Sequence, residues 1–277
     1  MNTVDYVTSV FGLDGETAIV TGGAGVLPYA MASTLARAGA RVALWGRGTN
    51  HPVEEAADKL MKDLELPDDQ VAAVTVDTAD EAATAKAFSE TQRRLGMPTI
   101  LVNGVGGNRG KSDFTEIDVK TFEEVVTMNL LAGLVIPLKV CAREWIAAEQ
   151  PGSVINLSSM TSYKALSGVW AYNAAKSAVL NLTEGAAREF AAHGIRVNGN
   201  APGFFLGHQN RALLVADDST GELTARGRAI IDRTPFGRFG APADMEGATL
   251  FLASRNAAGF ITGVTIPVDG GYLVDNI

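Results

Sequence analysis

The chain has 277 residues, of which 47% are hydrophobic and 19% are charged, and its formal net charge is −8. This composition is ordinary for a folded domain and excludes an intrinsically disordered chain, which has few apolar residues and a large net charge. The acidic balance argues against nucleic acid as a partner, and the single cysteine, Cys141, excludes an internal disulfide.

Short apolar runs typical of strands alternate along the chain with helix-length amphipathic runs. The predicted strands are 17–21, 41–45, 71–76, 99–103, 153–157, 195–199 and 263–267. The predicted helices are 28–38, 52–64, 80–95, 122–149, 169–192 and 242–254, and we expect Pro137 to kink the fourth of them. Alternating strands and helices imply β-α-β crossovers. The pattern therefore predicts an α/β fold, with one doubly wound domain over residues 1–277, a parallel sheet of about seven strands and helices on both faces.

Residues 204–239 interrupt this alternation and are rich in Gly, Asn, Asp and Arg. Long irregular stretches in compact domains are usually functional. Ligands of open α/β sheets bind at the carboxyl ends of the strands, which this stretch would overhang. We therefore predict that residues 204–239 form a substrate lid.

A glycine-rich stretch follows the first predicted strand and reads Thr21-Gly22-Gly23-Ala24-Gly25-Val26-Leu27-Pro28. Glycine lets backbone approach a pyrophosphate closely, and the next helix supplies free N–H groups at its first turn. We expect the cofactor-binding residues here to be Gly22, Gly23, Gly25, Val26 and Leu27. The alternative is a tight turn that binds nothing.

The ends of the next two strands bear on the choice of cofactor. Arg47 stands where an NAD-binding fold has an acidic residue for the ribose 2′-hydroxyl, and an arginine can instead hold a 2′-phosphate. We therefore favour NADP(H), with NAD(H) as the second choice, and the alternative is a solvated surface arginine. After the third strand, Asp77 either accepts from the adenine amino group or caps the helix that begins near Asp80.

A serine, a tyrosine and a lysine have the spacing of a catalytic group. Ser159 ends the fifth strand, Tyr172 follows thirteen residues later, and Lys176 lies four residues beyond on the same helix face. A nearby cation lowers the pKa of a phenol, which gives a proton donor and acceptor suited to carbonyl/alcohol interconversion. The alternative is that Tyr172 and Lys176 are ordinary helix residues.

With these residues the sequence resembles the short-chain dehydrogenase/reductase family, from about Leu13 to about Gly271. The matching segments are Thr21–Gly25, Asn103–Gly106, Asn129 in Met-Asn-Leu-Leu-Ala-Gly, Ser159, Tyr172, Lys176, Ile195–Asn198, Pro202-Gly203, Thr262-Gly263 and Val268–Gly271. The resemblance implies a Rossmann-type domain and a nicotinamide cofactor. It also implies a catalytic tetrad in which Tyr172 is the acid/base, Lys176 holds the nicotinamide ribose and lowers the tyrosine pKa, Ser159 orients the substrate and Asn129 holds a water.

The resemblance implies further cofactor contacts, namely Asn103, Gly104, Val105, Tyr172, Lys176, Pro202, Gly203 and Phe205. The chain departs from the family pattern at three places. Val26 and Pro28 stand where glycines are expected, Asn103-Gly104-Val105-Gly106 replaces Asn-Asn-Ala-Gly, and Gly207 replaces a threonine. These departures concern the finer cofactor contacts.

A closer resemblance is to the D-mannonate oxidoreductase, or D-fructuronate reductase, branch. It rests on Ala201–Leu206, Gln209–Leu214, Gly221–Thr224 and Thr234–Gly240. The branch implies oxidation of a sugar-acid hydroxyl or reduction of the keto acid. The candidate substrate-binding residues are Ser159, Met160, Asn108, Arg109, Phe204, His208, Asn210 and Arg211. Of these, Arg211 would pair with a carboxylate, and His208 and Asn210 would bind hydroxyls.

Other functions stay open from the sequence. The same chemistry could act on a polyol, a hydroxysteroid or a 3-ketoacyl thioester, although the absence of a basic run argues against a thioester carrier. A nicotinamide-sensing protein without turnover is a different class. It would not need the tetrad.

The remaining expectations concern location and assembly. The chain shows no signal-peptide pattern, no uncharged apolar run of about 18 residues and no zinc-binding motif. We expect a cytoplasmic enzyme without metal or membrane partner. The family resemblance implies a homotetramer that pairs through the helices at 122–149 and 169–192 and through the last strand.

Overall fold

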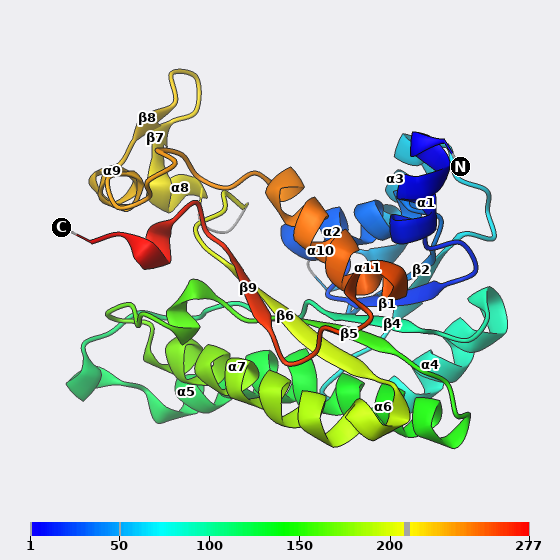
Figure 1. Ribbon diagram of the computed structural model, residues 1–277. Helices are drawn as coiled ribbons and strands as arrows, with labels where there is room; N and C mark the ends of the chain where they lie inside the picture. The colour runs from blue at the N-terminus through cyan, green and yellow to red at the C-terminus, as the bar shows by residue number, and fades with distance from the viewer. Residues whose placement is uncertain (1, 50, 208–210, 277) are drawn as a thin grey trace.

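The computed structural model describes residues 2–49, 51–207 and 211–276, and it contains one seven-stranded sheet (Figure 1). The strand order is β3-β2-β1-β4-β5-β6-β9, and all neighbours are parallel. The strands are β1 (Thr17–Thr21), β2 (Arg41–Gly46), β3 (Val71–Thr75), β4 (Ile100–Asn103), β5 (Ser153–Leu157), β6 (Arg196–Pro202) and β9 (Thr265–Val268). The order reverses between β1 and β4, which is where such sheets bind ligands. The predicted doubly wound fold is confirmed.

Helices cover both faces of the sheet (Figure 1). One face carries α2 (Val26–Arg37), α3 (Val53–Leu64), α10 (Glu246–Ala253) and α11 (Arg255–Ala258), and the other carries α4 (Glu81–Leu95), α5 (Val119–Val126), α6 (Ile136–Ala147) and α7 (Trp170–Phe190). Successive residues of a strand point to opposite faces. In β1, Ala18 and Val20 accordingly join the core under α2, whereas Ile19 joins the core under α4 and α6. The continuous apolar strands thus serve two cores.

Short helical turns fill several connections. They are η1 (Phe114–Glu116), η3 (Met160–Ser162), η4 (Ala191–His193), η5 (Pro242–Met245) and η6 (Tyr272–Val274). The chain also begins with a helix that was not expected, α1 (Thr3–Phe11), which starts with a capping box between Asn2 and Asp5. Its far end is tied to the start of α11 by the hydrogen bond from Ser254 Oγ to Val10 O.

The expected irregular stretch 204–239 contains structure of its own. It holds α8 (Arg211–Leu214), the antiparallel pair β7 (Val215–Asp217) and β8 (Glu222–Leu223), and α9 (Ala225–Ile231). The Asp217 carboxylate accepts from Ser219 N at 2.8 Å, and Gly221 adopts a positive φ of 74°. These features close the hairpin turn, and the hairpin lies at the same end of the molecule as the C-terminal segment (Figure 1).

The predicted helix at 122–149 is interrupted before Pro137. A π-helical segment, η2 (Thr127–Val135), separates α5 from α6, and Ile136 N donates to Leu131 O five residues back. Pro137 has no N–H for the next carbonyl in this pattern, that of Ala132. Thr78 Oγ1 donates to that carbonyl instead, at 2.9 Å. The expected kink at the proline is therefore corrected to a π-helical segment ahead of it.

The helical run Val119–Ala147 is long and apolar enough, by length and composition, to cross a membrane. Inside the fold, however, 56% of its most apolar window is buried. Its apolar side chains therefore serve mainly to pack this run against the sheet and α7.

Candidate active site

The predicted site residues follow adjacent strands of the sheet. The glycine loop follows β1, Asn103–Gly106 ends and follows β4, Ser159 follows β5, and Pro202-Gly203 ends β6. Because the strands are parallel, their carboxyl ends meet at one edge. The hairpin β7–β8 and the C-terminal turn η6 lie at this same end of the molecule (Figure 1).

The tyrosine and lysine lie in the first turns of α7. Lys176 is only 4% exposed, its Nζ donates to Leu157 O at 2.8 Å, and it lies 5.7 Å from the centroid of the Tyr172 ring. Ser159 hydrogen-bonds the Tyr172 phenol and also accepts from Thr161 N at 3.1 Å. The three residues are therefore neighbours at the end of β5.

The electrostatics of this pair differ from the expectation. Burial raises the pKa of the Tyr172 phenol, and the hydrogen bond with Ser159 lowers it by less. Burial also lowers the pKa of Lys176 to about 8. The expected net lowering of the tyrosine pKa by the lysine is thus wrong for this structure, because loss of solvation dominates at Tyr172 while Nζ is directed at the Leu157 carbonyl.

Asn129 ties the loop after β4 to the helix beneath it. Its Nδ2 donates to Gly107 O at 2.7 Å and to Val125 O at 2.8 Å, and its Oδ1 accepts from Gly107 N at 3.0 Å. A Cβ on the adjacent Gly106 would lie 2.7 Å from Asn129 Oδ1 and 3.0 Å from Lys176 Nζ. The asparagine and the lysine therefore both lie where a Gly106 side chain would point, so all four residues of the predicted tetrad are brought together.

The glycine loop after β1 turns directly into α2. Gly22 has a positive φ of 64°, Gly25 is the residue before the helix, and Gly25 N donates to Gly22 O at 2.8 Å. Val26 and Leu27 occupy the first helical positions, where backbone N–H groups have no acceptor within the helix. These N–H groups face the switch point and suit an anionic group such as a pyrophosphate.

Two departures from the family pattern contact each other. Pro28 is buried in the first turn of α2, and a Cβ on Gly104 would lie 2.6 Å from its Cγ. A Cβ on Gly22 would lie 3.1 Å from Gly104 O. The room that a glycine at position 28 would leave is therefore supplied by Gly104 across the loop. Glycine at 22, 104 and 106 thus lets the two loops pack closely, and the free N–H groups at the start of α2 fit the pyrophosphate of a dinucleotide.

Arg47 and Asp77 face each other at the ends of β2 and β3. Arg47 Nη1 lies 4.0 Å from Asp77 Oδ2, and both side chains are about half exposed. Asp77 also accepts from Ala79 N at 3.0 Å, whereas the cap of α4 is Asp80, which accepts from Ala83 N. The alternative in which Asp77 caps the helix is therefore wrong.

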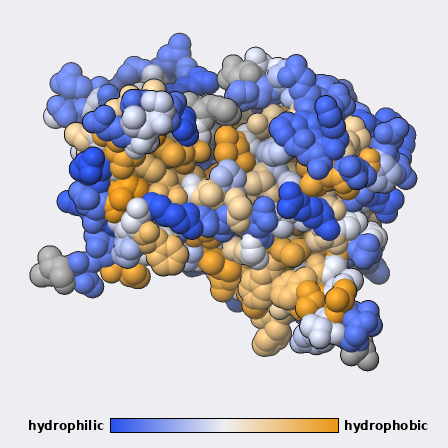
Figure 2. Space-filling model, turned by 90° about the horizontal axis from the view of Figure 1, so that it is seen from above, coloured by the Kyte–Doolittle hydropathy of each residue, from blue (hydrophilic) through white to orange (hydrophobic). Residues whose placement is uncertain are grey.

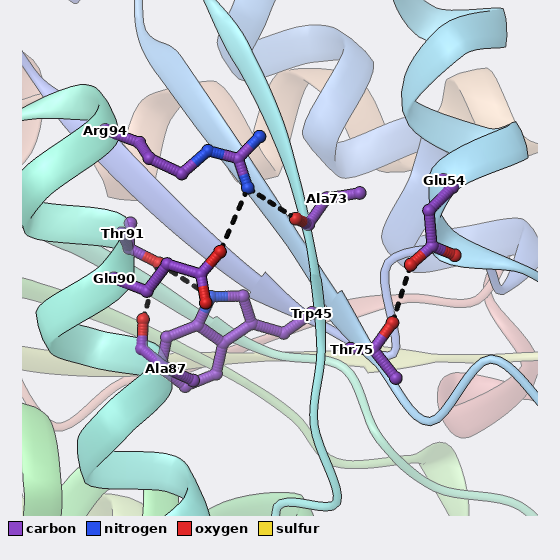
Figure 3. A network of polar contacts seen from close by, with 8 residues as sticks. All are labelled: Trp45, Glu54, Ala73, Thr75, Ala87, Glu90, Thr91 and Arg94. Atoms are coloured by element: carbon purple, nitrogen blue, oxygen red, sulfur yellow. Dashed lines mark hydrogen bonds and ion pairs between the residues drawn. The ribbon is translucent and has the colours of Figure 1, made fainter.

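Polar contacts fix these two strands to their helices (Figure 3). The hydrogen bonds run from Trp45 Nε1 to Thr91 Oγ1 at 3.0 Å, from Arg94 Nη1 to Ala73 O at 2.8 Å and from Thr75 Oγ1 to Glu54 Oε1 at 2.6 Å. The last of these holds the pKa of the Glu54 carboxyl below its usual value. These hydrogen bonds to α3 and α4 therefore fix the positions of the strand ends that precede Arg47 and Asp77.

The predicted substrate-binding residues differ in burial and in their contacts within the chain. Met160 is buried beside Ser159, and Phe205 is buried with its ring against Gly240. The Phe204 ring packs edge-on against Tyr272, with the centroids 5.2 Å apart. Asn108 donates to the nearby carbonyl of Gly110.

The two predicted substrate arginines have acidic partners within the chain. Arg211 Nε lies 2.8 Å from Asp218 Oδ1, and Arg109 Nη1 lies 3.6 Å from Glu124 Oε2. His208 and Asn210 lie outside the described residues. The sequence reasoning did not find Tyr272 or Lys164, which meet near Phe204; the available signals were their positions just after Gly270-Gly271 and five residues after Ser159.

Comparison with known proteins gives a consistent result. Residues 24–273 match the family model described as enoyl-(acyl carrier protein) reductase. The chain is 38% identical over 276 residues to the uncharacterized oxidoreductase UxuB of Bacillus subtilis (strain 168), covering 94% of this chain and 96% of that protein.

Two solved structures are similar over nearly their whole length. One is a protein from Haemophilus influenza assigned as a D-mannonate oxidoreductase, with bound NAD, at a TM-score of 0.85 and 32% identity, covering 98% of this chain and 99% of that chain. The other is a gluconate 5-dehydrogenase from Burkholderia cenocepacia J2315 in complex with NADP and tartrate, at a TM-score of 0.83 and 32% identity, covering 97% and 99%.

Proposed function

Because the chain belongs to the short-chain dehydrogenase/reductase family, we propose that it is an NAD(P)-dependent oxidoreductase that interconverts a secondary alcohol and a ketone on a sugar acid. The observation that carries the proposal is the meeting of the tetrad: Asn129 and Lys176 adjoin Gly106, Lys176 lies beside the Tyr172 ring, and Ser159 hydrogen-bonds the Tyr172 phenol. A sensor without turnover would not require these proton-transfer groups together.

Each tetrad residue has a proposed task. Tyr172 moves the proton to and from the substrate oxygen, and Ser159, which hydrogen-bonds the phenol, orients that oxygen. Lys176, buried beside the Tyr172 ring, would hold the ribose of a bound cofactor. Asn129 fixes the loop after β4 and holds a water for the proton relay. A bound nicotinamide would supply or accept the hydride.

The cofactor of this enzyme is NADP(H) by preference, with NAD(H) as the second choice. Arg47 at the end of β2 offers a cation for a 2′-phosphate, and no acidic residue stands in its place. The two similar structures, one with NADP and one with NAD, support a nicotinamide cofactor and leave room for both. Asp77, beside Arg47, accepts from the adenine amino group.

The substrate we propose is a sugar acid such as D-mannonate, with D-fructuronate as the keto form. The names of the similar structures, a D-mannonate oxidoreductase and a gluconate 5-dehydrogenase, support this class. Residues 204–239 would act as its lid. Seen from above, the outward surface of this hairpin region is hydrophilic, while hydrophobic residues gather beside it toward the middle of the molecule (Figure 2).

We also propose that the enzyme is a cytoplasmic homotetramer. An open, mostly apolar groove of about 660 Å³ runs along the outer sides of α6 and α7, lined by Leu134, Leu138, Ile146, Leu182 and Phe190 among others. The same helices of a second copy would cover it. Light scattering of the purified protein tests this, and a monomer at micromolar concentration would contradict it.

The function is tested by mixing the protein with NADPH or NADH and one of four substrates. These are D-fructuronate, 5-keto-D-gluconate, a neutral ketose and an acetoacetyl thioester, and absorbance of the reduced nicotinamide is followed. We expect turnover of a keto acid, with NADPH preferred. Turnover of the ketose or thioester alone would refute the sugar-acid assignment. Tight cofactor binding with no turnover of any of the four would favour the sensor.

A further inference from the structure

The segment just after Ser159 places a lysine at the edge of the proposed active site. Lys164 N donates to Met160 O at 3.0 Å, which closes the turn η3. Ser162 Oγ, in the same turn, donates to Lys176 O at 2.7 Å. The backbone that carries Lys164 is thus fastened both to the end of β5 and to the catalytic turn of α7.

The Lys164 side chain lies over the Tyr272 ring, which is itself packed against Phe204. Its Nζ lies 5.4 Å from the centroid of the Tyr272 ring, and Tyr272 is only 5% exposed. The Phe204 ring packs against Tyr272 at an interplanar angle of 72°. Because these residues follow β5, β6 and β9, three neighbouring strands bring the cluster to the ligand-binding edge of the sheet. A cation over an aromatic face is held in place while its other side stays available to an anion.

Three arginines of this region have acidic partners, whereas Lys164 forms no ion pair with another described residue. Arg211 is paired with Asp218 and Arg109 with Glu124. Arg238 forms a two-pronged pair with Asp244, whose pKa it lowers to about 2. A substrate carboxylate would have to displace one of these internal carboxylates. Among the described residues, no acidic side chain forms an ion pair with Lys164.

We propose that Lys164, positioned by the Tyr272 ring, binds the carboxylate of the polyhydroxy-acid substrate and is the residue that selects acids over neutral polyols. This inference rests on the proposed function. The reacting carbon lies at Ser159 and Tyr172, and the far end of the carbon chain carries the carboxylate to Lys164. The Phe204–Tyr272 pair forms an apolar wall that keeps the ammonium from turning away. The assignment replaces Arg211, whose guanidinium already has Asp218 as its partner.

The test compares Lys164→Met, Lys164→Arg and the control Lys120→Met, which removes an exposed lysine from α5. Methionine keeps the aliphatic length and removes the charge. With NADPH and the best keto acid of the wild type, we expect Lys164→Met to raise KM at least tenfold while kcat at saturation stays within about threefold. Lys164→Arg should restore KM to within about threefold, and Lys120→Met should behave as wild type.

A second pair of variants tests the aromatic support without touching the charge. Tyr272→Phe should leave KM unchanged, since the ring face remains, whereas Tyr272→Leu should raise KM with little change in kcat. The NADPH dissociation constant, measured by fluorescence titration, should be the same in all variants and checks that each one is folded.

The outcomes separate the two proposals. If the wild type turns over keto acids but Lys164→Met leaves KM unchanged, or lowers kcat instead, the role of Lys164 is overturned and the proposed function stands. A failure of Lys164→Arg to restore KM has the same meaning. If the wild type binds NADPH but turns over no polyhydroxy keto acid, the proposed function fails and this inference fails with it.

Discussion

Replacing Lys176 with methionine should stabilise the cofactor-free protein at pH 7 while abolishing its turnover. Lys176 is 4% exposed, and burial lowers its pKa from 10.5 to about 8. At pH 7 the ammonium is charged in both the folded and the unfolded chain. Folding therefore moves a charge out of water, and no acidic residue of the described chain forms an ion pair with it.

The size of the effect follows from the pKa. A drop from 10.5 to about 8 corresponds to roughly 3 kcal/mol of destabilisation at pH 7, at about 1.4 kcal/mol for each pKa unit. The variant also loses the hydrogen bond from Nζ to Leu157 O, which offsets about 1 kcal/mol of the gain. We therefore expect Lys176→Met to raise the free energy of unfolding by about 1–3 kcal/mol.

The pH dependence has a definite sign. Between pH 8 and 10.5 the unfolded chain binds the lysine proton while the folded chain has largely released it. The stability contributed by this group therefore rises with pH across that window. The advantage of Lys176→Met should shrink from pH 8 upward and nearly vanish above pH 10.5.

Urea denaturation at pH 7 and pH 9.5, followed by the fluorescence of the buried Trp45 and Trp145, measures this difference. Lys120→Met is the matched control, because it removes the same charge from an exposed position and should change stability by less than about 0.5 kcal/mol. If Lys176→Met is less stable than the wild type at pH 7, and by the same amount at pH 9.5, the reasoning from charge burial is wrong.

The remaining predictions concern the proton donor, the cofactor and the core. Tyr172→Phe should lower turnover by about 10²–10⁴-fold while NADPH binding, followed by fluorescence titration, stays within about threefold; unchanged turnover would contradict the mechanism. Because burial raises the pKa of Tyr172 above its ordinary value of 10, the phenol stays mostly protonated from pH 7 to 10. Alcohol oxidation, which needs the phenolate, should therefore speed up across this range while ketone reduction changes little, and pH-rate profiles in both directions check this. Arg47→Asp should shift the ratio of dissociation constants from NADP(H) toward NAD(H); an unchanged ratio would make Arg47 a surface residue only. Asn198→Leu should lower the free energy of unfolding by about 1–3 kcal/mol, because the Asn198 amide donates to Ile261 O and accepts from Val264 N. Asn200→Leu should lower it less, because the Asn200 amide has no hydrogen-bond partner in the described chain. Equal losses of stability in urea denaturation would contradict this.

The sheet could be predicted because each strand carries its own signal. Thr17–Thr21 is buried at every position, so its apolar run stands out without knowledge of its neighbours. The hairpin within residues 204–239 has no such signal, since β7 and β8 span three and two residues and none of these residues is buried. Helix α1 was missed for a related reason, because it buries none of its residues and begins with a short-range capping box.

The catalytic pair was predictable for a different reason. Tyr172 and Lys176 share one helix face, so their spacing alone brings them together. Their pKa values were not predictable in this way. The value of Lys176 depends on burial among Leu157, Gly106 and Asn129, which come from other elements. The spacing of Tyr172 and Lys176 along the helix identifies the pair. Their loss of solvation depends on residues from other elements, which come together only in the folded sheet edge.

The same distinction explains why the predicted substrate-binding role of two arginines, and the effect of two departures from the family's glycine pattern, could be judged only in the folded structure. Arg211 and Arg109 were credible carboxylate ligands as single residues, yet Asp218 and Glu124 already pair with them. Pro28 and Gly104 each depart from the family pattern, but in the fold one substitution supplies the room that the other removes. A side chain at a ligand edge can therefore be assigned only with its partner. For that reason Lys164, a cation with an aromatic support and no ion pair to another described residue, is the stronger candidate for an anionic substrate.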